Sequence, residues 1–172
     1  MLNNKLEQQI NDQIQYEFFS AYLYLSMSVW FETKNLKGFA NWMRIQFQEE
    51  QAHALHMLDY VNGRGATVKL QALQVPKHTW ENIIDVFKDT LEHEQSVTKR
   101  INDLVSEASN EKDHASFNFL QWYVGEQVEE EANVSQILEQ LKLIEGTGPG
   151  LFMIDKDLQA RVFVDPFANA KA

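Results

Sequence analysis

The chain has 172 residues, a formal net charge of −10 and no cysteine. This length suits one domain with a sizeable core, and the lack of cysteine excludes disulfides, iron–sulfur clusters, thiolate metal sites and thiol catalysis. The acidity favours cations over nucleic-acid backbones as partners, although ordinary solubility is its simpler reading. No apolar run reaches membrane-spanning length, and Met1 to Glu7 lack the features of a signal peptide. We therefore expect a cytoplasmic protein that binds neither nucleic acid nor a membrane.

Four long amphipathic helices are predicted, and each carries ionisable or amide side chains on its apolar face. With about 100° of rotation per residue, Glu17 shares its face with Ile14 and Ala21. A buried carboxylate is costly unless it is paired, protonated or bound to a metal, so this pattern on four helices indicates a buried metal cluster. The expected helices and their polar residues are 5–33 with Glu17, 36–63 with Glu50 and His53, 79–108 with Glu94, and 113–144 with Gln127 and Glu130.

The connections predict how these helices are joined. The breaks near residues 34–35 and 110–112 are short, so each flanking pair should form an antiparallel hairpin. Asn35 and Asp113 are the expected N-caps of the second and fourth helices. About fifteen residues, 64–78, separate the second helix from the third. Fifteen extended residues reach ~50 Å and can return along a helix of ~40 Å, which predicts a four-helix bundle with one long crossover.

The C-terminal part follows a glycine-rich break at residues 146–150. Apolar residues between 151 and 162 then recur with a helical period and predict a short fifth helix. We expect one domain over residues 1–164 and a disordered tail over residues 165–172.

The spacing Glu50-x-x-His53 is the sharpest local motif. Residues three apart share a helix face, so a carboxylate and an imidazole can bind one ion together. Taken alone the spacing is common, His53 could be an ordinary core histidine, and Glu17 and Glu94 could lie at the edge of a bundle. Their coincidence fits the pattern of di-iron carboxylate bundles, in which two helices give a Glu each and two give Glu-x-x-His.

The fourth helix departs from that pattern, because it offers Gln127 and Glu130 but no histidine. One metal position should therefore be well supplied with ligands, and the other should be poorer. Oxygen ligands with a single nitrogen suit Fe(II), and also Mn(II) or Zn(II). The expected ligands are Glu17, Glu50 and His53 at the first position, and Glu50, Glu94 and Glu130 at the second, with Gln127 nearby.

Neighbouring residues extend this hypothesis. Tyr24 lies two turns from Glu17; a core tyrosine is its simpler role, but it could hydrogen-bond a ligand or donate an electron. Glu49, Glu126 and Glu129 would usually form a solvated charged face, yet their clustering permits a third, surface-side cation site.

Three stretches of the chain resemble bacterial non-haem ferritins. They are residues 41–53 (NWMRIQFQEEQAH), 117–131 (FNFLQWYVGEQVEEE) and 150–156 (GLFMIDK), and the resemblance extends to about Val164. It implies an all-α, ferritin-like four-helix bundle with one long crossover between helices two and three, plus a short C-terminal fifth helix that would line four-fold channels. It also implies a homo-oligomeric shell of twenty-four subunits that oxidises Fe(II) with dioxygen, or hydrogen peroxide, and stores Fe(III) mineral.

The resemblance also implies roles for individual residues. The ferroxidase ligands carry over onto Glu17, Glu50, His53, Glu94 and Gln127, with Tyr24 as the adjacent tyrosine and Glu130 close by. An additional iron site matches Glu49, Glu126, Glu129 and Glu130.

Departures from related families narrow the hypothesis. Haem-containing bacterioferritins carry a second Glu-x-x-His and a methionine haem ligand where this chain has Glu130 and Ala52, so no haem is expected. The acids of the three-fold iron channel in animal ferritins align with Phe117 and Leu120, which leaves the route of iron into the shell open. Rubrerythrins are disfavoured because their extra iron domain needs cysteines. Two other classes of function stay open, a di-iron oxygenase acting on an organic substrate and a structural or signalling helical bundle.

Overall fold

The computed structural model describes residues 2–168, which form five helices and no strand. The prediction of an all-α chain is therefore confirmed for these residues. None of the five described helices is both long and apolar enough to cross a membrane. The helices are α1 (Asn4–Thr33), α2 (Lys37–Gly63), α3 (Ile83–Asn110), α4 (His114–Leu143) and α5 (Gly148–Leu158).

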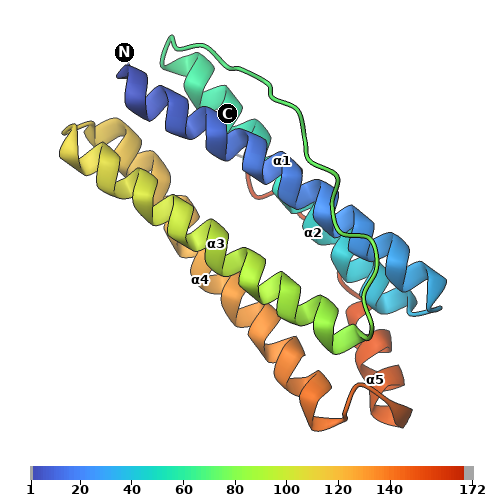
Figure 1. Ribbon diagram of the computed structural model, residues 1–172. Helices are drawn as coiled ribbons and strands as arrows, with labels where there is room; N and C mark the ends of the chain where they lie inside the picture. The colour runs from blue at the N-terminus through green and yellow to red at the C-terminus, as the bar shows by residue number, and fades with distance from the viewer. Residues whose placement is uncertain (1, 169–172) are drawn as a thin grey trace. The chain divides into compact units, whose positions relative to one another are not determined.

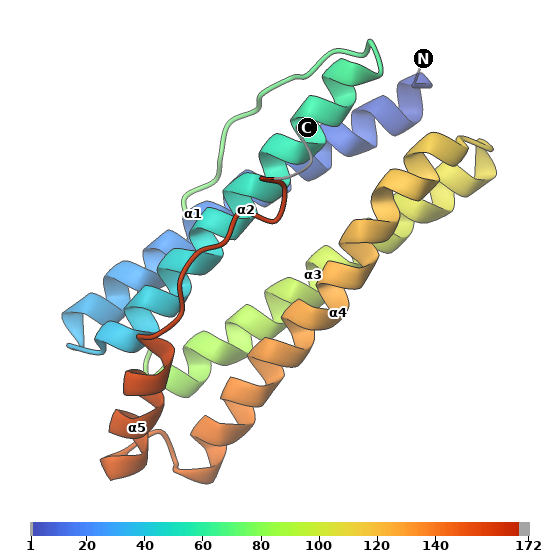
Figure 2. The same cartoon turned by 180° about the vertical axis from the view of Figure 1, so that it is seen from behind.

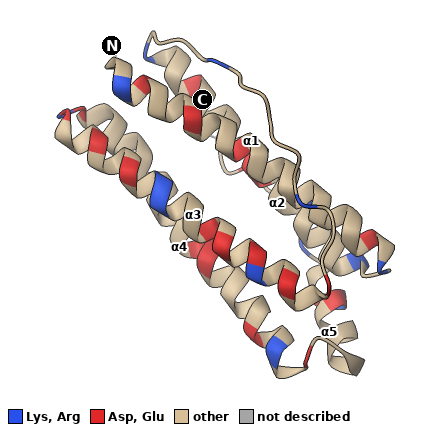
Figure 3. Ribbon diagram, in the orientation of Figure 1, with Lys and Arg blue, Asp and Glu red and all other residues tan. Residues whose placement is uncertain are grey.

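The helices belong to two compact units, which are described separately. The first unit contains Ile10–Thr79 and the chain from Gly148 onward, and the second contains Leu2–Gln9 and Trp80–Thr147. In the first, α1 and α2 lie side by side, and α5 lies against one end of α2 (Figures 1 and 2). In the second, α3 and α4 form a pair. Acidic residues occur along both helix pairs (Figure 3).

The turn between α1 and α2 is tight and differs from the expectation in one detail. Asn35 adopts a left-handed conformation with φ of +59°, and α2 begins two residues later at Lys37. The prediction that Asn35 caps α2 is therefore wrong. The cap comes from α5 instead, because Asp155 Oδ1 accepts hydrogen bonds from the backbone N–H groups of Gly38 at 2.8 Å and Phe39 at 3.1 Å.

Replacing Asp155 by alanine should remove this external cap. Loss of an N-cap oxygen typically costs about 0.5–2 kcal/mol, and we expect a loss in the upper half of that range because two N–H groups lose their acceptor. Urea unfolding of the purified protein would measure the change. The exposed residue Asp157 lies on the same helix, so Asp157→Ala is the control and should leave stability within about 0.5 kcal/mol. Equal effects of both substitutions would contradict the assigned cap.

The crossover between α2 and α3 runs alongside α1 in the same direction as that helix (Figure 1). It has no regular secondary structure over residues 66–80, but side chains of α1 hydrogen-bond its backbone. Asn11 binds at both ends of its amide, donating to the Thr67 carbonyl at 3.0 Å and accepting from the Lys69 N–H at 2.6 Å. Gln15 and Ser26 donate to the carbonyls of residues 72 and 77 at 3.2 and 2.8 Å.

The second unit follows the sequence prediction closely at its turn. Asp113 caps α4 and accepts from the Ser116 N–H at 3.1 Å, as expected. Helix α3 begins later than predicted, because Asn82 accepts from the Asp85 N–H at 3.0 Å and caps the helix there. The start of the chain belongs to this unit, where Lys5 Nζ lies 2.6 Å from Glu107 Oε2.

Residues 159–168 form a C-terminal strap along α2. Within the region expected to be a disordered tail, Asp165 Oδ1 accepts from the Phe167 N–H at 2.8 Å in a turn. The Phe167 ring stacks on His56 of α2 with 3.7 Å between ring centroids. Residues 169–172 of the expected tail lie outside the described residues.

Candidate metal centre

Glu17 of α1 meets Glu50 and His53 of α2 inside the first unit. One ligand atom from each residue lies within 4.8 Å of the other two. All three are buried, with 1 % of Glu17 and 2 % each of Glu50 and His53 exposed. The helical spacing explains this meeting, because Glu50 and His53 are one turn apart on one face of α2. Two carboxylates and one imidazole form a donor set that suits Fe(II), Mn(II) or Zn(II).

Hydrogen bonds fix part of this group. Gln13, one turn before Glu17 on α1, is buried and donates from Nε2 to Glu17 Oε1 at 2.8 Å. His53 Nδ1 lies 3.7 Å from Glu50 Oε2. The buried atoms Glu17 Oε2, Glu50 Oε2 and His53 Nε2 take part in no hydrogen bond among the described residues. A cation at their centre would satisfy such atoms, so the donor set fits a metal ion.

The protonation state of His53 suits metal binding. Desolvation by burial, with a smaller contribution from nearby His56, lowers the pKa of His53 to about 3. The imidazole is therefore neutral at neutral pH, which is the form that binds metals.

The second unit brings Glu94 of α3 and Gln127 of α4 together. Gln127 Nε2 donates to Glu94 Oε2 at 3.0 Å and lies 3.3 Å from the Glu94 backbone carbonyl. It also lies 3.4 Å from Thr98 Oγ1. Glu130, one turn further along α4, is buried as well. Three of the predicted site residues, on α3 and α4, are thus buried, and uncompensated charge is costly in such surroundings.

The remaining predicted site residues differ in their surroundings. Tyr24 is fully buried on α1. Glu126 is half-buried and Glu129 exposed on α4. Glu49 forms a salt bridge, in which its Oε2 lies 2.7 Å from Arg161 Nη2 of the C-terminal strap.

The sequence analysis did not predict two residues that contact the proposed ligands, Gln13 at Glu17 and Arg161 at Glu49. Gln13 stands four residues before Glu17, so the helical period could have placed it beside the carboxylate. Arg161 is 112 residues from Glu49, and no local pattern connects them.

The chain has similar counterparts among known proteins. Residues 7–144 match the model of the ferritin-like domain. The chain belongs to the ferritin family.

Curated ferritins match nearly the whole chain. A probable bacterial non-heme ferritin-like protein of Haemophilus influenzae is 40 % identical over 158 residues, covering 92 % of this chain and 96 % of that protein. A bacterial non-heme ferritin of Bacteroides fragilis is 42 % identical over 161 residues, covering 94 % of this chain and 100 % of that protein. The resemblance to bacterial non-haem ferritins is therefore confirmed.

Solved ferritin structures agree with the fold. An open-pore ferritin of Archaeoglobus fulgidus is 49 % identical and superposes with a TM-score of 0.93, covering 94 % of this chain and 100 % of that one. The predicted ferritin fold, all-α with a short fifth helix, is confirmed by this likeness and by the family match.

Proposed function

We propose that this ferritin binds Fe(II), oxidises it with dioxygen or hydrogen peroxide and stores the Fe(III) product as mineral. The observation that carries the proposal is the buried group of Glu17, Glu50 and His53, whose ligand atoms lie within 4.8 Å of one another. Membership of the ferritin family supports iron as the metal and iron storage as the general function. Iron is here a substrate that arrives, reacts and leaves.

In the proposed reaction two Fe(II) ions bind side by side. Glu17 and His53 hold one ion, Glu94 holds the other, and Glu50 bridges them, with Glu130 close to the second ion. Each Fe(II) loses one electron and dioxygen gains both, so that with protons from water it leaves as hydrogen peroxide. Hydrolysis then joins the Fe(III) ions through oxygen before they move to the mineral. Gln127 would hydrogen-bond on the oxygen side, and Tyr24 would act as the adjacent hydrogen-bond or electron donor.

The ligand set is asymmetric, which supports transit of iron over permanent retention. One proposed position has an imidazole and two carboxylates. At the other, the amide of Gln127 contacts Glu94 where a symmetric di-iron bundle would supply a second Glu-x-x-His. An incomplete ligand set holds its ion less tightly and leaves room for oxygen to bind.

Exposed apolar side chains support assembly into a homo-oligomer, which we propose to be a shell of twenty-four subunits. Exposed large apolar side chains leave water when a second subunit covers them, which favours association. Such residues occur on α1, the crossover and α5; they include Tyr22, Val29, Leu70, Val75, Phe152 and Met153.

One experiment tests storage against the other functions. The purified protein should run at the mass of about twenty-four subunits and retain hundreds of irons per shell after aerobic loading, which native mass measurement and iron assay would show. A small oligomer that holds only two irons per subunit would instead favour a di-iron oxygenase. A protein without tight Fe(II) binding would favour a structural bundle and contradict the proposal.

A further inference from the structure

Arg161 of the C-terminal strap places a positive charge on the carboxylate of Glu49. Its Nη2 lies 2.7 Å from Glu49 Oε2, and its Nη1 donates to Gln46 Oε1. The guanidinium carbon lies 5.1 Å from the centre of the Trp42 ring, within the range of a cation–π contact. Three side chains of α2 therefore hold one guanidinium group.

The backbone on both sides of Arg161 is also held against α2. On the N-terminal side, the Asn41 amide donates to the Arg161 carbonyl at 3.0 Å and to the Leu158 carbonyl at 3.3 Å. On the C-terminal side, Phe167 stacks on His56. Arg161 is therefore fixed between two anchors.

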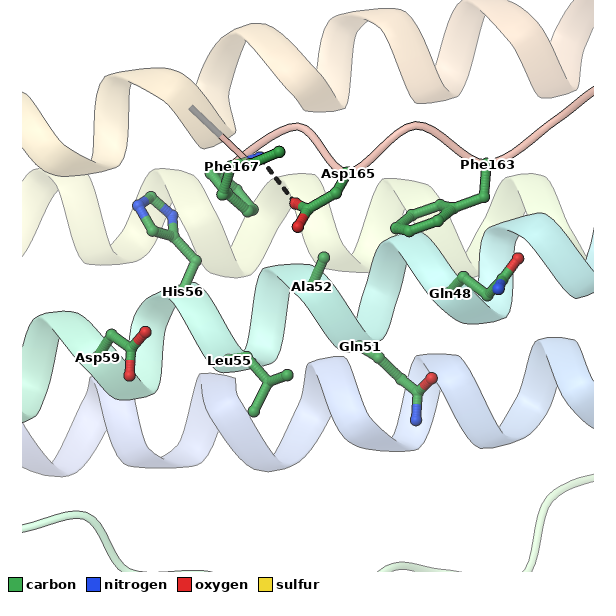
Figure 4. A pocket seen from close by; sticks show the side chains of 10 residues that line it. Gln48, Gln51, Ala52, Leu55, His56, Asp59, Phe163, Asp165 and Phe167 are labelled. Carbon is green, nitrogen blue, oxygen red and sulfur yellow. Dashed lines mark hydrogen bonds between the residues drawn. The ribbon is translucent and has the colours of Figure 1, made fainter. Parts of the chain in front are cut away.

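Between these anchors the strap and α2 enclose a half-open pocket of about 610 Å³. Phe163 and Phe167 extend from the strap over α2 in Figure 4, where the turn made by Asp165 is also visible. The pocket lies beside the strap after Arg161, and Glu49 does not line it. The guanidinium of Arg161 is therefore held by its contacts with α2 and does not line the pocket.

A metal cation and a guanidinium group compete for the same oxygen. Glu49 Oε2 already accepts a charge-assisted hydrogen bond, and only 16 % of the Glu49 side chain and 26 % of the Arg161 side chain are exposed. A divalent cation bound to that oxygen would lie within a few ångströms of the guanidinium, where partial burial leaves little screening of their repulsion.

We propose that Arg161 is the resident counter-ion of Glu49 and that any metal ion binding at Glu49 must displace it. This inference rests on the proposed function, because it concerns the third, surface-side cation site expected at Glu49, Glu126 and Glu129. We call this the outer site. Arg161 is then a positioning residue that weakens this outer site without touching the buried ligands Glu17 and His53. Metal ions would reach Glu49 only when the guanidinium moves away from α2.

The test is calorimetric titration of Zn(II), which is not oxidised, into the assembled iron-free protein. We expect a tight class of ions and a weaker class, and Arg161→Gln should tighten the weaker class by at least about tenfold, since removing the cation leaves a partly buried carboxylate to the metal. Arg161→Lys, which keeps the charge, should stay close to the original affinity. In an Arg161→Gln, Glu49→Gln double variant the gain should disappear.

The effect of a loosened strap on Zn(II) affinity must be distinguished from the effect of the lost positive charge. Phe167→Ala removes the stacking on His56 but leaves Arg161 in place, so it should not change the weaker class. The inference is overturned if Phe167→Ala reproduces the gain, if the gain persists with Glu49→Gln, or if Arg161→Gln binds no additional ion more tightly. Circular dichroism checks that each variant retains its helices.

Failure of the proposed function would look different. The tightly bound class of Zn(II) ions should vanish in His53→Ala. If the unmodified protein showed no tightly bound Zn(II), the proposed oxidation site would be contradicted. The coupling between Arg161 and Glu49 is measured on the weaker class alone, so either proposal can fail by itself.

Discussion

Replacing His53 by alanine should slow the initial oxidation of Fe(II) by at least about a hundredfold. Removal of residues that merely support a metal ligand typically costs about 10–100-fold in affinity or activity, and His53 would be a direct ligand. It is also the one nitrogen donor in the group of Glu17, Glu50 and His53. Stopped-flow absorbance at about two Fe(II) per subunit would measure this step before mineral growth contributes.

His56→Ala is the matched control for that measurement. His56 lies one turn further along α2 and is half-buried against Phe167, so its removal perturbs the same helix without removing a proposed ligand. Its oxidation rate should stay within a fewfold of the original. An unchanged rate for His53→Ala, in a variant that still assembles, would refute the assignment of His53.

Gly38→Ala should destabilise the protein, although this substitution inside a helix normally stabilises by about 0.5–1 kcal/mol. A Cβ at Gly38 would overlap the backbone carbonyl of Asp155 and approach its Cα to 3.0 Å. Because backbone cannot rotate away as a side chain can, α5 must move, and the Asp155 cap on α2 is then lost. Forced overpacking typically costs about 1–3 kcal/mol, which urea unfolding would measure.

Gly125→Ala provides the opposite sign as a control. Gly125 lies inside α4, and a Cβ there would meet nothing within 4 Å, so alanine should stabilise by up to about 1 kcal/mol. Limited proteolysis should also cut the α5 region faster in Gly38→Ala than in Gly125→Ala. Equal stabilisation by both substitutions would show that α5 does not approach Gly38 so closely.

The sequence predicts the helices well because their signals are local. Periodicity located the four long helices, and the Asp113 cap was correct because its partner, the Ser116 N–H, is three residues away. The cap of α2 could not be found in this way. Its acceptor Asp155 lies 117 residues beyond Gly38, and only folding brings them together.

The residues of the candidate site also differ in whether local sequence patterns could predict their contacts. The helical period suffices to place Glu50 and His53 on one face and to mark Glu17 as buried, and these three residues do gather in the structure. Their grouping with Glu94 as one di-iron centre remains a prediction. The pairing of Glu49 with Arg161 depends on the strap returning along α2, and no periodic pattern contains that return.

The crossover owes its path to a helix that precedes it in the chain. Asn11, Gln15 and Ser26 of α1 bind backbone carbonyl and N–H groups of the crossover, and every residue offers a backbone carbonyl whatever its side chain. The path of this loop therefore depends largely on side chains of α1. A substitution within the loop leaves its backbone carbonyls in place, whereas a change at Asn11 removes hydrogen bonds to a segment more than fifty residues away.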